Sequence, residues 1–197
     1  MRTRSDGESI LLLLDAIQVL RAQNVDYAIV GAIAASIHGP VRASHDADAL
    51  LSISTPALKD LEQSFQKAGF GTDLRRGDMG DPIAAVLSLH DKFENRVDLL
   101  VGIRGFDPAG FSRTIEIPFE GESLKVVGLE DFVAMKLFAG GPQDLADAHN
   151  ALEATPEPPD MGLLRSLAAR YGVETARSLE KLQKELDRGL DPGFELD

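Results

Sequence analysis

Short strand-like segments alternate with helical segments through most of this chain of 197 residues, and that order limits the fold more than any other feature. Apolar residues recur at helical spacing over residues 9–23, whereas residues 27–30 form a short apolar run that ends at a glycine, as a buried strand does. A second helical segment over residues 32–38 is stopped by a Gly-Pro pair. Such alternation predicts a sheet covered by helices.

The later segments continue the same pattern. We expect further strands over residues 46–53, 83–89, 96–101, 114–119 and 123–127, and helices over residues 56–68, 129–139, 144–152 and, in two pieces, 161–189. Residues 71–81 are polar and rich in glycine, which predicts a loop. The order predicts a mixed α/β or α+β sheet domain, and of the two we expect an α+β fold, with a mixed β-sheet flanked by helices and a helical C-terminal part. We expect an α/β domain over residues 1–127 and a helical region over residues 128–197.

The composition excludes several classes of protein. The chain has no Cys, which excludes disulfides, thiolate metal sites and cysteine nucleophiles. Its longest strictly apolar run, Ile10–Leu14, is too short to span a membrane, and the acidic residues around it do not fit a signal peptide, so we expect a cytoplasmic protein with no membrane partner. A net charge of −12 argues against a protein that coats nucleic acid through bulk charge, but it suits carboxylates that bind divalent cations.

Three aspartates are the strongest candidates for a functional site. Asp46 and Asp48 are two residues apart at the start of an expected strand, so both side chains point to the same side, with Cα atoms roughly 6.5 Å apart. Asp98 lies inside the apolar segment Arg96–Leu100, where an isolated charge would be costly. If the two strands are neighbours, the three carboxylates repel one another, and divalent cations relieve that repulsion. Oxygen ligands without His or Cys indicate Mg²⁺ or Mn²⁺.

Each of these residues also has an ordinary structural explanation. Aspartate is common at turns and strand ends, and an edge strand would expose Asp98 to water. The pair His45-Asp46 matches the dyad of metal phosphohydrolases, but that class needs a largely helical core and further histidines. Arg75-Arg76 in the expected loop could contact a nucleic acid acceptor, although a solvated loop explains them more simply. The sequence contains neither a P-loop nor a G-x-S-x-G pattern.

A glycine turn precedes the paired aspartates. Gly31 ends one expected strand and lets the backbone turn tightly, so that N–H groups of the following helix, from Ala32 onward, could meet a phosphate. Arg42 and Ser44 stand just before Asp46, and an arginine in this place can clamp a phosphate. A solvated loop arginine explains Arg42 equally well. Together with the aspartates, the turn indicates a site for phosphate and metal.

The segment VGAIAASIHGPVRASHDADALL resembles the first motif of the nucleotidyltransferases of the DNA polymerase β superfamily. That motif is a strand, a Gly-Ser or Gly-Gly turn, a loop, and then D-x-D or D-x-E. In RVDLL, Asp98 matches the third, strand-borne acid of the family. The segment GLEDFVAMKLFAGGPQDLADAHNAL is similar to a later motif of the Abi-type nucleotidyltransferases of toxin–antitoxin systems, in which a helical lysine precedes an Asp-x-x-Asp helix. The resemblance covers roughly residues 20–155.

The resemblance implies a nucleotidyltransferase-like fold and a metal-dependent enzyme that moves an NMP from an NTP to an acceptor hydroxyl. The acceptor would be RNA such as tRNA, a protein or a small molecule, and one implied role is that of a toxin with a partner antitoxin. The implied catalytic and metal-binding residues, for Mg²⁺ or Mn²⁺, are Asp46, Asp48 and Asp98. The implied nucleotide-binding residues are Gly31, Ala32, Arg42, Ser44 and Lys136, and the auxiliary residues are Asp144 and Asp147.

The chain departs from the family motif at Ala32, where a glycine or a serine is usual. A serine hydroxyl would contact a phosphate and a methyl group cannot, although the backbone N–H still can. The alternative is therefore a catalytically weak or inactive module that binds nucleotide or a partner and keeps the fold. Lys136 also fits a surface lysine, and Asp144 and Asp147 fit acids that the helix dipole favours near a helix start.

Overall fold

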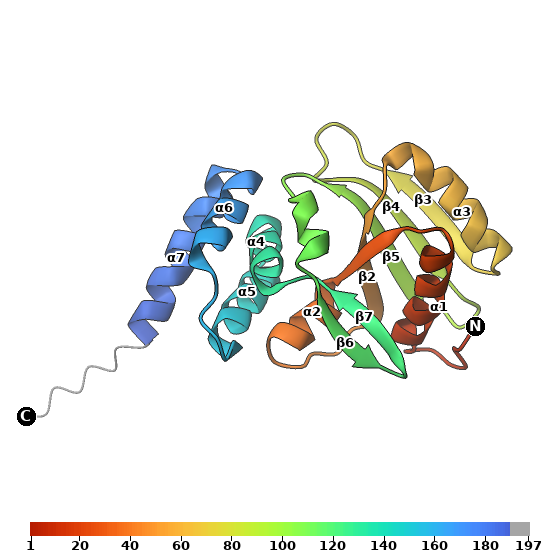
Figure 1. Cartoon of the computed structure of the whole chain (residues 1–197), viewed down its shortest axis with the longest axis horizontal. Helices are drawn as coiled ribbons and strands as arrows, with labels where there is room; N and C mark the ends of the chain where they lie inside the picture. The colour runs from red at the N-terminus through yellow and green to blue at the C-terminus, as the bar shows by residue number, and fades with distance from the viewer. Residues whose placement is uncertain (190–197) are drawn as a thin grey trace, which may run out of the picture. The chain divides into compact units, whose positions relative to one another are not determined.

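The computed structural model describes residues 1–189, which Figure 1 shows as a ribbon. The chain forms two compact units. Unit 1 comprises residues 1–37, 41–104 and 108–128, and unit 2 comprises residues 38–40, 105–107 and those from Leu129 onward. The last part of the expected helical region, residues 190–197, lies outside the described residues. No helix within residues 1–189 is both long enough and apolar enough to cross a membrane.

Unit 1 is built on one mixed sheet, which has seven strands within the described residues, in the order β3-β4-β5-β2-β1-β7-β6. The strands are β1 (Asp26–Val30), β2 (Asp46–Ser52), β3 (Gly71–Arg76), β4 (Ile83–His90), β5 (Arg96–Ile103), β6 (Ile115–Phe119) and β7 (Glu122–Val126). The pairs β2–β5 and β1–β7 are parallel, and the other neighbours are antiparallel. The predicted mixed sheet is therefore confirmed.

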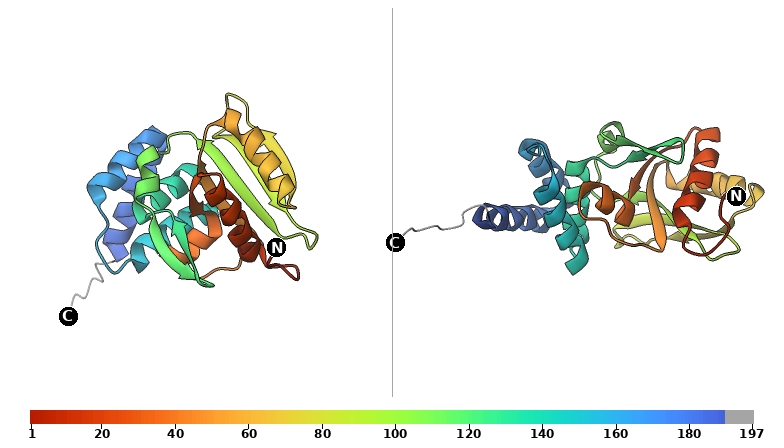
Figure 2. Two further views of the ribbon diagram at one scale, coloured as in Figure 1. Left: turned by 45° about the vertical axis from the view of Figure 1, so that its right-hand side comes forward. Right: turned by 90° about the horizontal axis from the view of Figure 1, so that it is seen from below.

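Two helices of unit 1 cover one face of this sheet, as Figures 1 and 2 show. The first, α1 (Ser9–Ala22), contacts β2 and β5, and the second, α3 (Leu58–Lys67), contacts β3 and β4. Side chains along a strand point alternately to the covered face and to the open face. Along β5, Val97 and Leu99 are fully buried under the helices, whereas Asp98 is half-buried on the opposite face. The opposite face is therefore where polar side chains can gather.

Three shorter elements complete unit 1. The helix α2 (Gly31–His38), which belongs to unit 1 up to residue 37, follows β1 without an intervening loop, and η1 (Thr55–Ala57) and η2 (Pro108–Ser112) are short 3₁₀ segments. Pro56 lies in the first turn of η1, as its position after Thr55 predicts.

The loop predicted over residues 71–81 is wrong in its first half. Gly71–Arg76 form β3, which pairs antiparallel with β4 and places Leu74 opposite Leu87. The strand lies at the edge of the sheet, and its residues are exposed or half-buried. An edge strand needs few apolar residues, so its polar sequence carried no alternation that predicts a strand.

Unit 2 is helical. Its helices are α4 (Leu129–Ala139), α5 (Pro142–Ala154), α6 (Met161–Tyr171) and α7 (Val173–Gly189). The helix α4 is central, since it contacts the other three and buries Phe132, Val133 and Leu137. Gly172, with φ of +119°, separates α6 from α7. The predicted helical C-terminal part is confirmed, whereas the assignment of catalysis to residues 1–127 stays a prediction.

Candidate active site

The sheet brings the three predicted aspartates together on the face that α1 and α3 leave open. Strands β2 and β5 are parallel neighbours, and their register places Asp48 beside Asp98 and Asp46 beside Arg96. Residues paired in this way point to the same face, with Cα atoms about 4.8 Å apart. Asp48 and Asp98 are half-buried and Asp46 is exposed. Two segments far apart in the sequence thus contribute carboxylates to one place.

A guanidinium group lies among these carboxylates. Arg96 donates from Nε to Asp98 Oδ1 at 3.0 Å and from Nη2 to Asp98 Oδ2 at 2.9 Å. Its hydrogen bonds to Asp98, with the charges of Asp98, Asp46 and Asp48, outweigh burial and raise the pKa of Arg96. Sequence reasoning missed Arg96, although its spacing of two from Asp98 already places both on one strand face.

Gly31 allows the Asp48 carboxylate to lie against the start of α2. The glycine has φ of +63°, a backbone conformation that other residues rarely adopt. A Cβ atom at this position would lie only 2.0 Å from Asp48 Oδ2. The antiparallel register of β1 and β2 pairs Val30 with Asp48, which accounts for this close approach. A side chain at residue 31 would therefore displace the carboxylate.

A cavity of about 310 Å³ opens beside Asp46 in unit 1. Four predicted site residues line it, namely Ala32, Arg42, Ser44 and Asp46. Ser36, which sequence reasoning missed, donates to the Ala32 carbonyl at 3.0 Å and accepts from the Arg42 N–H at 3.2 Å. This bridge holds the segment before β2 against α2. No pattern in the sequence singles out Ser36, because its partners are backbone groups four and six residues away.

Two of the lining residues limit what the cavity can offer a ligand. Ala32 is 6% exposed, so its methyl group belongs to the wall. The Ser44 hydroxyl donates to the Asp46 carbonyl at 2.8 Å. Because a hydroxyl has a single proton, Ser44 can donate to a phosphate only by giving up that bond.

The other predicted residues form an ionic cluster within unit 2. Lys136 Nζ lies 2.8 Å from Asp144 Oδ1 and 2.9 Å from Asp147 Oδ2. The side chain of Lys136 is 13% exposed and that of Asp147 is 4% exposed. The explanation of Lys136 as an ordinary surface lysine is therefore wrong. The cluster joins α4 to α5, and a role of its members toward nucleotide stays a prediction.

The donor atoms of the three aspartates suit a divalent cation, although the present arrangement does not gather them around one. Carboxylate oxygens are the ligands that Mg²⁺ and Mn²⁺ prefer. Within residues 1–189, no three His, Cys, Asp or Glu side chains are grouped so that they could hold a metal ion. In this arrangement both oxygens of Asp98 accept from the Arg96 guanidinium. The three aspartates have the donor atoms that a metal ion prefers, and they lie on neighbouring strands. Arg96 is the cation that competes with a metal ion for Asp98.

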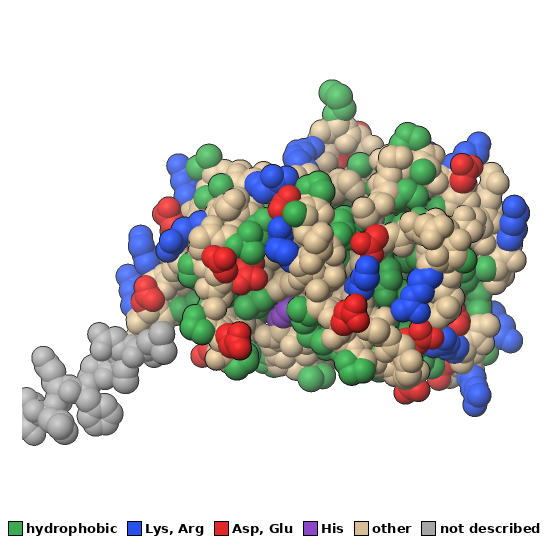
Figure 3. Space-filling model, in the orientation of Figure 1, with side chains coloured by type: hydrophobic (Ala, Val, Ile, Leu, Met, Phe, Trp, Pro, Cys, Tyr) green, Lys and Arg blue, Asp and Glu red, His purple; other side chains and the backbone are tan. Residues whose placement is uncertain are grey.

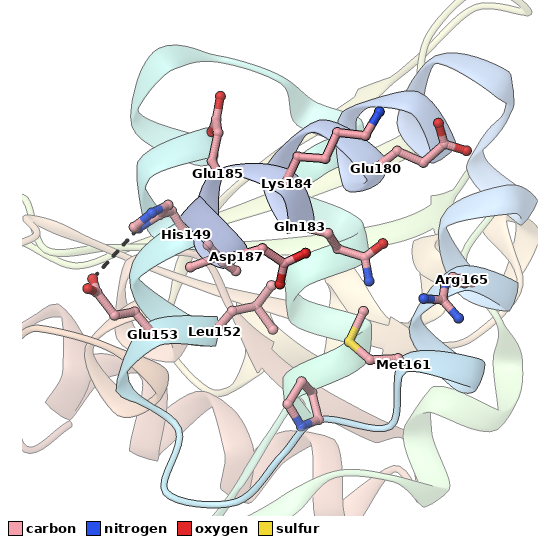
Figure 4. Close-up of a pocket in the computed structure, with 12 residues that line it drawn as sticks. His149, Leu152, Glu153, Met161, Arg165, Glu180, Gln183, Lys184, Glu185 and Asp187 are labelled. Carbon is pink, nitrogen blue, oxygen red and sulfur yellow. Dashed lines mark ion pairs between the residues drawn. The ribbon is translucent and has the colours of Figure 1, made fainter. Parts of the chain in front are cut away.

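A larger cavity, of about 740 Å³, lies within unit 2 and offers different chemistry. Figure 4 shows it among α5, α6 and α7, with His149 paired to Glu153 at 3.7 Å. Its charged lining mixes both signs: Arg165, Lys184, Glu180, Glu185 and Asp187. None of the predicted site residues lines this cavity. We therefore place the candidate active site on the open sheet face of unit 1.

Comparison with known proteins supports the fold but gives no close relative. No protein-family model matches the chain, and no curated protein matches its sequence. An antigenic nucleotidyltransferase-like protein from Paracoccidioides brasiliensis is 19% identical, with a TM-score of 0.53 over 91% of this chain and 93% of that one. The antibiotic-resistance factor ANT(2″)-Ia is 12% identical in its solution structure, with a TM-score of 0.59 over 93% of this chain and 99% of that one.

A second structure of ANT(2″)-Ia contains adenylyl-2″-tobramycin. It is 13% identical to this chain, with a TM-score of 0.57 over 83% of this chain and 97% of that one. At such identities the similarity establishes the fold alone. The chain has the α+β fold of nucleotidyltransferase-like proteins.

Proposed function

We propose that this protein is a metal-dependent nucleotidyltransferase, which moves an NMP group from an NTP to an acceptor hydroxyl. The observation that carries the proposal is the strand register, which places Asp48 beside Asp98 on the face that also holds Asp46. The nucleotidyltransferase-like fold supports it. The adduct bound to ANT(2″)-Ia, an adenylyl group on an acceptor, is the kind of product that this reaction would give.

Asp46, Asp48 and Asp98 are the proposed ligands of Mg²⁺ or Mn²⁺. Bound divalent ions would neutralise the charge that develops on the attacking and leaving oxygens. Arg96 already places positive charge at Asp98, so its guanidinium and a cation compete for the same two oxygens. This competition predicts that Arg96 weakens metal binding and stabilises the metal-free protein.

The proposed place for the triphosphate is the cavity beside Asp46. Backbone N–H groups where α2 begins, at Gly31 and Ala32, can donate to phosphate oxygens there. The Arg42 guanidinium can clamp the same group, since arginine donates two parallel hydrogen bonds to phosphate. For Lys136, Asp144 and Asp147, only the resemblance supports a role toward nucleotide.

Asp98 is the proposed acceptor of the hydroxyl proton. As the proton moves to the carboxylate, the acceptor oxygen attacks the α-phosphorus. The bond from the α-phosphorus to the bridging oxygen then breaks, and pyrophosphate leaves with that electron pair. Positioning of the two substrates and neutralisation of charge would provide most of the rate enhancement.

The test is transfer of label from each α-labelled NTP, with Mg²⁺, to fractions of a cell extract. We expect transfer by the natural chain and a loss of about 100-fold or more in Asp46→Asn. Asp60→Asn is the matched control, because Asp60 is an exposed aspartate on α3. Equal transfer by Asp46→Asn and the control would contradict the proposed site.

A nucleotide-binding module without catalysis is the second candidate, and Ala32 favours it. Its buried methyl group stands where the family motif often supplies a phosphate-binding hydroxyl. Under this alternative, Mg²⁺ with NTP raises the melting temperature of the protein but no label is transferred. Label transfer therefore separates the two candidates, and the melting measurement on the same protein shows whether nucleotide binds at all.

A toxin role is a narrower form of the enzyme proposal, supported by the resemblance in α4 and α5. Induced expression of the natural chain would then arrest growth of the host cell, and Asp46→Asn would not. Relief of the arrest by a co-expressed partner would identify an antitoxin. Growth unaffected by an active enzyme would rule this role out.

A further inference from the structure

A second cavity in unit 1, of about 400 Å³, has Asp98 in its wall. Residues of β3, β4 and β5 and of the segment that joins β3 to β4 line it. The cavity beside Asp46 does not include Asp98, and this second one does not include Asp46. The carboxylates are therefore approached by two separate cavities. Such an arrangement suits an in-line displacement, in which the attacking group and the leaving group lie on opposite sides of the phosphorus.

The floor of the second cavity is an ordered row of side chains. Strand register aligns Arg75 with Val86 and Val86 with Leu100, so that one row crosses three strands. The adjacent row places Ser88 beside Asp98 on the same face. A molecule in this cavity would therefore meet an apolar floor at Val86 and Leu100, between a carboxylate and a guanidinium.

The lining of the cavity has two arginines, Arg75 and Arg76, and two aspartates, Asp81 and Asp98. Arg75 and Arg96 both donate from Nη2 to Ser88 Oγ, at 3.4 and 3.3 Å, so two positive groups share one neutral oxygen. Asp98 balances Arg96. The acid beside Arg75 is Asp73 at 3.8 Å, which is too long for a hydrogen bond, and both side chains are more than half exposed. An anion near Arg75 would relieve the repulsion between the guanidinium groups.

The rim of the cavity is held in place by backbone contacts. Arg104 Nη2 donates to the carbonyls of Met79 at 2.8 Å and Asp81 at 2.9 Å. The Gly77 N–H donates to the Ala84 carbonyl at 2.9 Å. These bonds fix the segment between β3 and β4, so the cavity is a built feature of unit 1.

We infer that this cavity binds the acceptor, and that the acceptor is a small hydroxylated compound that carries a phosphate or carboxylate group. The inference rests on the proposed function. The hydroxyl would lie at Asp98, the body of the molecule on Val86 and Leu100, and the anionic group at Arg75. Strand β4 separates β3 from β5, so these two strands lie two strand spacings apart. The hydroxyl and the anionic group of the acceptor are therefore separated by roughly 10 Å at most.

The charge preference of the cavity can be measured without catalysis. Because the chain has no Cys, Val86→Cys introduces a single thiol into the floor. The thiol is reacted with two methanethiosulfonates, the anionic sulfonatoethyl and the cationic trimethylammonioethyl reagent. Each rate is divided by the rate with the neutral methyl reagent, so that the intrinsic reactivity of the thiol cancels. Val173→Cys, at an exposed position on α7, supplies the same ratio at an ordinary site. The net charge of −12 disfavours the anionic reagent at both.

We expect the anionic-to-cationic ratio to be at least about fivefold higher at V86C than at V173C, which is about 1 kcal/mol of local preference. Arg75→Gln in the V86C background should abolish the difference. Inorganic phosphate and acetate, tested separately, should slow the neutral reagent at V86C only, and the stronger of the two identifies the anionic group. If V86C does not fold, Leu100→Cys places the thiol in the adjacent strand. Equal ratios at floor and control would overturn the inference.

A second arm identifies the acceptor class by activity. A small-molecule extract is separated on an anion exchanger, and each fraction is offered with labelled NTP and Mg²⁺, beside total RNA and protein. Transfer into the retained fraction supports the inference, whereas transfer only into the unretained fraction, RNA or protein overturns it. If no fraction takes label although V86C prefers the anionic reagent, the enzyme proposal and the inferred acceptor are both rejected. The cavity is then an anion-binding site only. If V86C shows no preference for the anionic reagent but label is still transferred, the enzyme proposal stands and only the inferred role of this cavity is rejected.

Discussion

Gly31 is the residue whose substitution tests the site most locally. We expect Gly31→Ala to displace the Asp48 carboxylate, because the new Cβ would lie 2.0 Å from its Oδ2. Gly69→Ala is the matched control, since Gly69 also has a positive φ, of +90°, but no atom lies within 4 Å of a Cβ there. In both variants a residue with a Cβ must adopt a positive φ, which lowers the free energy of unfolding by about 1–2 kcal/mol.

The clash should cost Gly31→Ala about 1–3 kcal/mol beyond that control and remove the melting-temperature rise with Mg²⁺ and NTP. Urea denaturation and thermal melting of the two variants make the comparison. Equal stability and equal response to nucleotide would mean that Asp48 tolerates a neighbour at residue 31.

Arg96 gives a second prediction at the residue scale, concerning metal removal. Without a guanidinium, Asp98 loses its bidentate partner. We expect Arg96→Gln to lower the free energy of unfolding in EDTA by about 1 kcal/mol, a modest cost because the arginine is partly exposed. Added Mg²⁺ should then raise the melting temperature more than in the natural chain. A variant that is equally stable with and without Mg²⁺ would show that Arg96 and metal do not compete.

The sequence points to the acids of the candidate site but not to the polar side chains around them. Asp46, Asp48 and Asp98 stand out because charge is unusual in a strand and because their order matches a motif. Arg96 lies two residues from Asp98 on one strand and could have been identified from that spacing. Ser88 does not stand out, since its contact with Arg96 depends on β4 and β5 becoming neighbours. That information resides in long-range pairing, which no local pattern contains.

The turn between β4 and β5 is stabilised by a buried aspartate. Burial by itself raises the pKa of Asp91, but hydrogen bonds from Thr3, from the Asn95 amide and from the Phe93 and Asn95 N–H groups outweigh it and lower the pKa below 3.8. Because the folded pKa is the lower one, the stabilisation is complete above 3.8 and is lost as pH falls through the folded value.

Asp91→Asn tests this element. The new amide would present a donor to Asn95 Nδ2, which now lies 3.0 Å from an Asp91 oxygen. We expect a loss of about 1–3 kcal/mol at pH 7, and the gap from the natural chain should narrow as pH falls below 3.8. Urea denaturation from pH 7 to pH 2.5 measures it, with Asp60→Asn as the control. A gap that is constant over this range would exclude the charge of Asp91 as its cause.

The helices α4 and α5 depend on the ion pair of Lys136. Replacement by methionine would leave the 4%-exposed side chain of Asp147 without its lysine. We expect Lys136→Met to cost about 3–5 kcal/mol in urea denaturation, and Asp147→Leu in the same chain to recover most of that loss. A cost below about 1 kcal/mol for Lys136→Met would identify an ordinary exposed pair.

Element by element, the helices and inner strands could be predicted because burial leaves a periodic sequence. The helix over 129–139 and the break at Gly172 are examples that the structure confirms. The edge strand β3 could not be predicted, since one side of it faces solvent and its residues follow no period. The sequence therefore predicts a loop where the structure has the strand that carries Arg75.

At the scale of the whole molecule, charge shapes the choice of partner. The net charge is −12, and Figure 3 shows Lys and Arg side chains interspersed with Asp and Glu on the face drawn. Nucleic-acid binding usually depends on a contiguous basic surface.

The strand order and the register of β2 with β5 also belong to the scale of the whole molecule, and they decide whether the aspartates meet.

The central claim is that Asp46, Asp48 and Asp98 act together on a metal–nucleotide complex. The most direct measurement is Mn²⁺ titration by electron paramagnetic resonance in the presence of a non-hydrolysable NTP analogue. The account predicts that Asp48→Asn and Asp98→Asn each weaken Mn²⁺ binding about tenfold or more, close to 1.4 kcal/mol, while Asp60→Asn leaves it unchanged. Unchanged Mn²⁺ affinity in Asp98→Asn would show that the β5 carboxylate takes no part in the site.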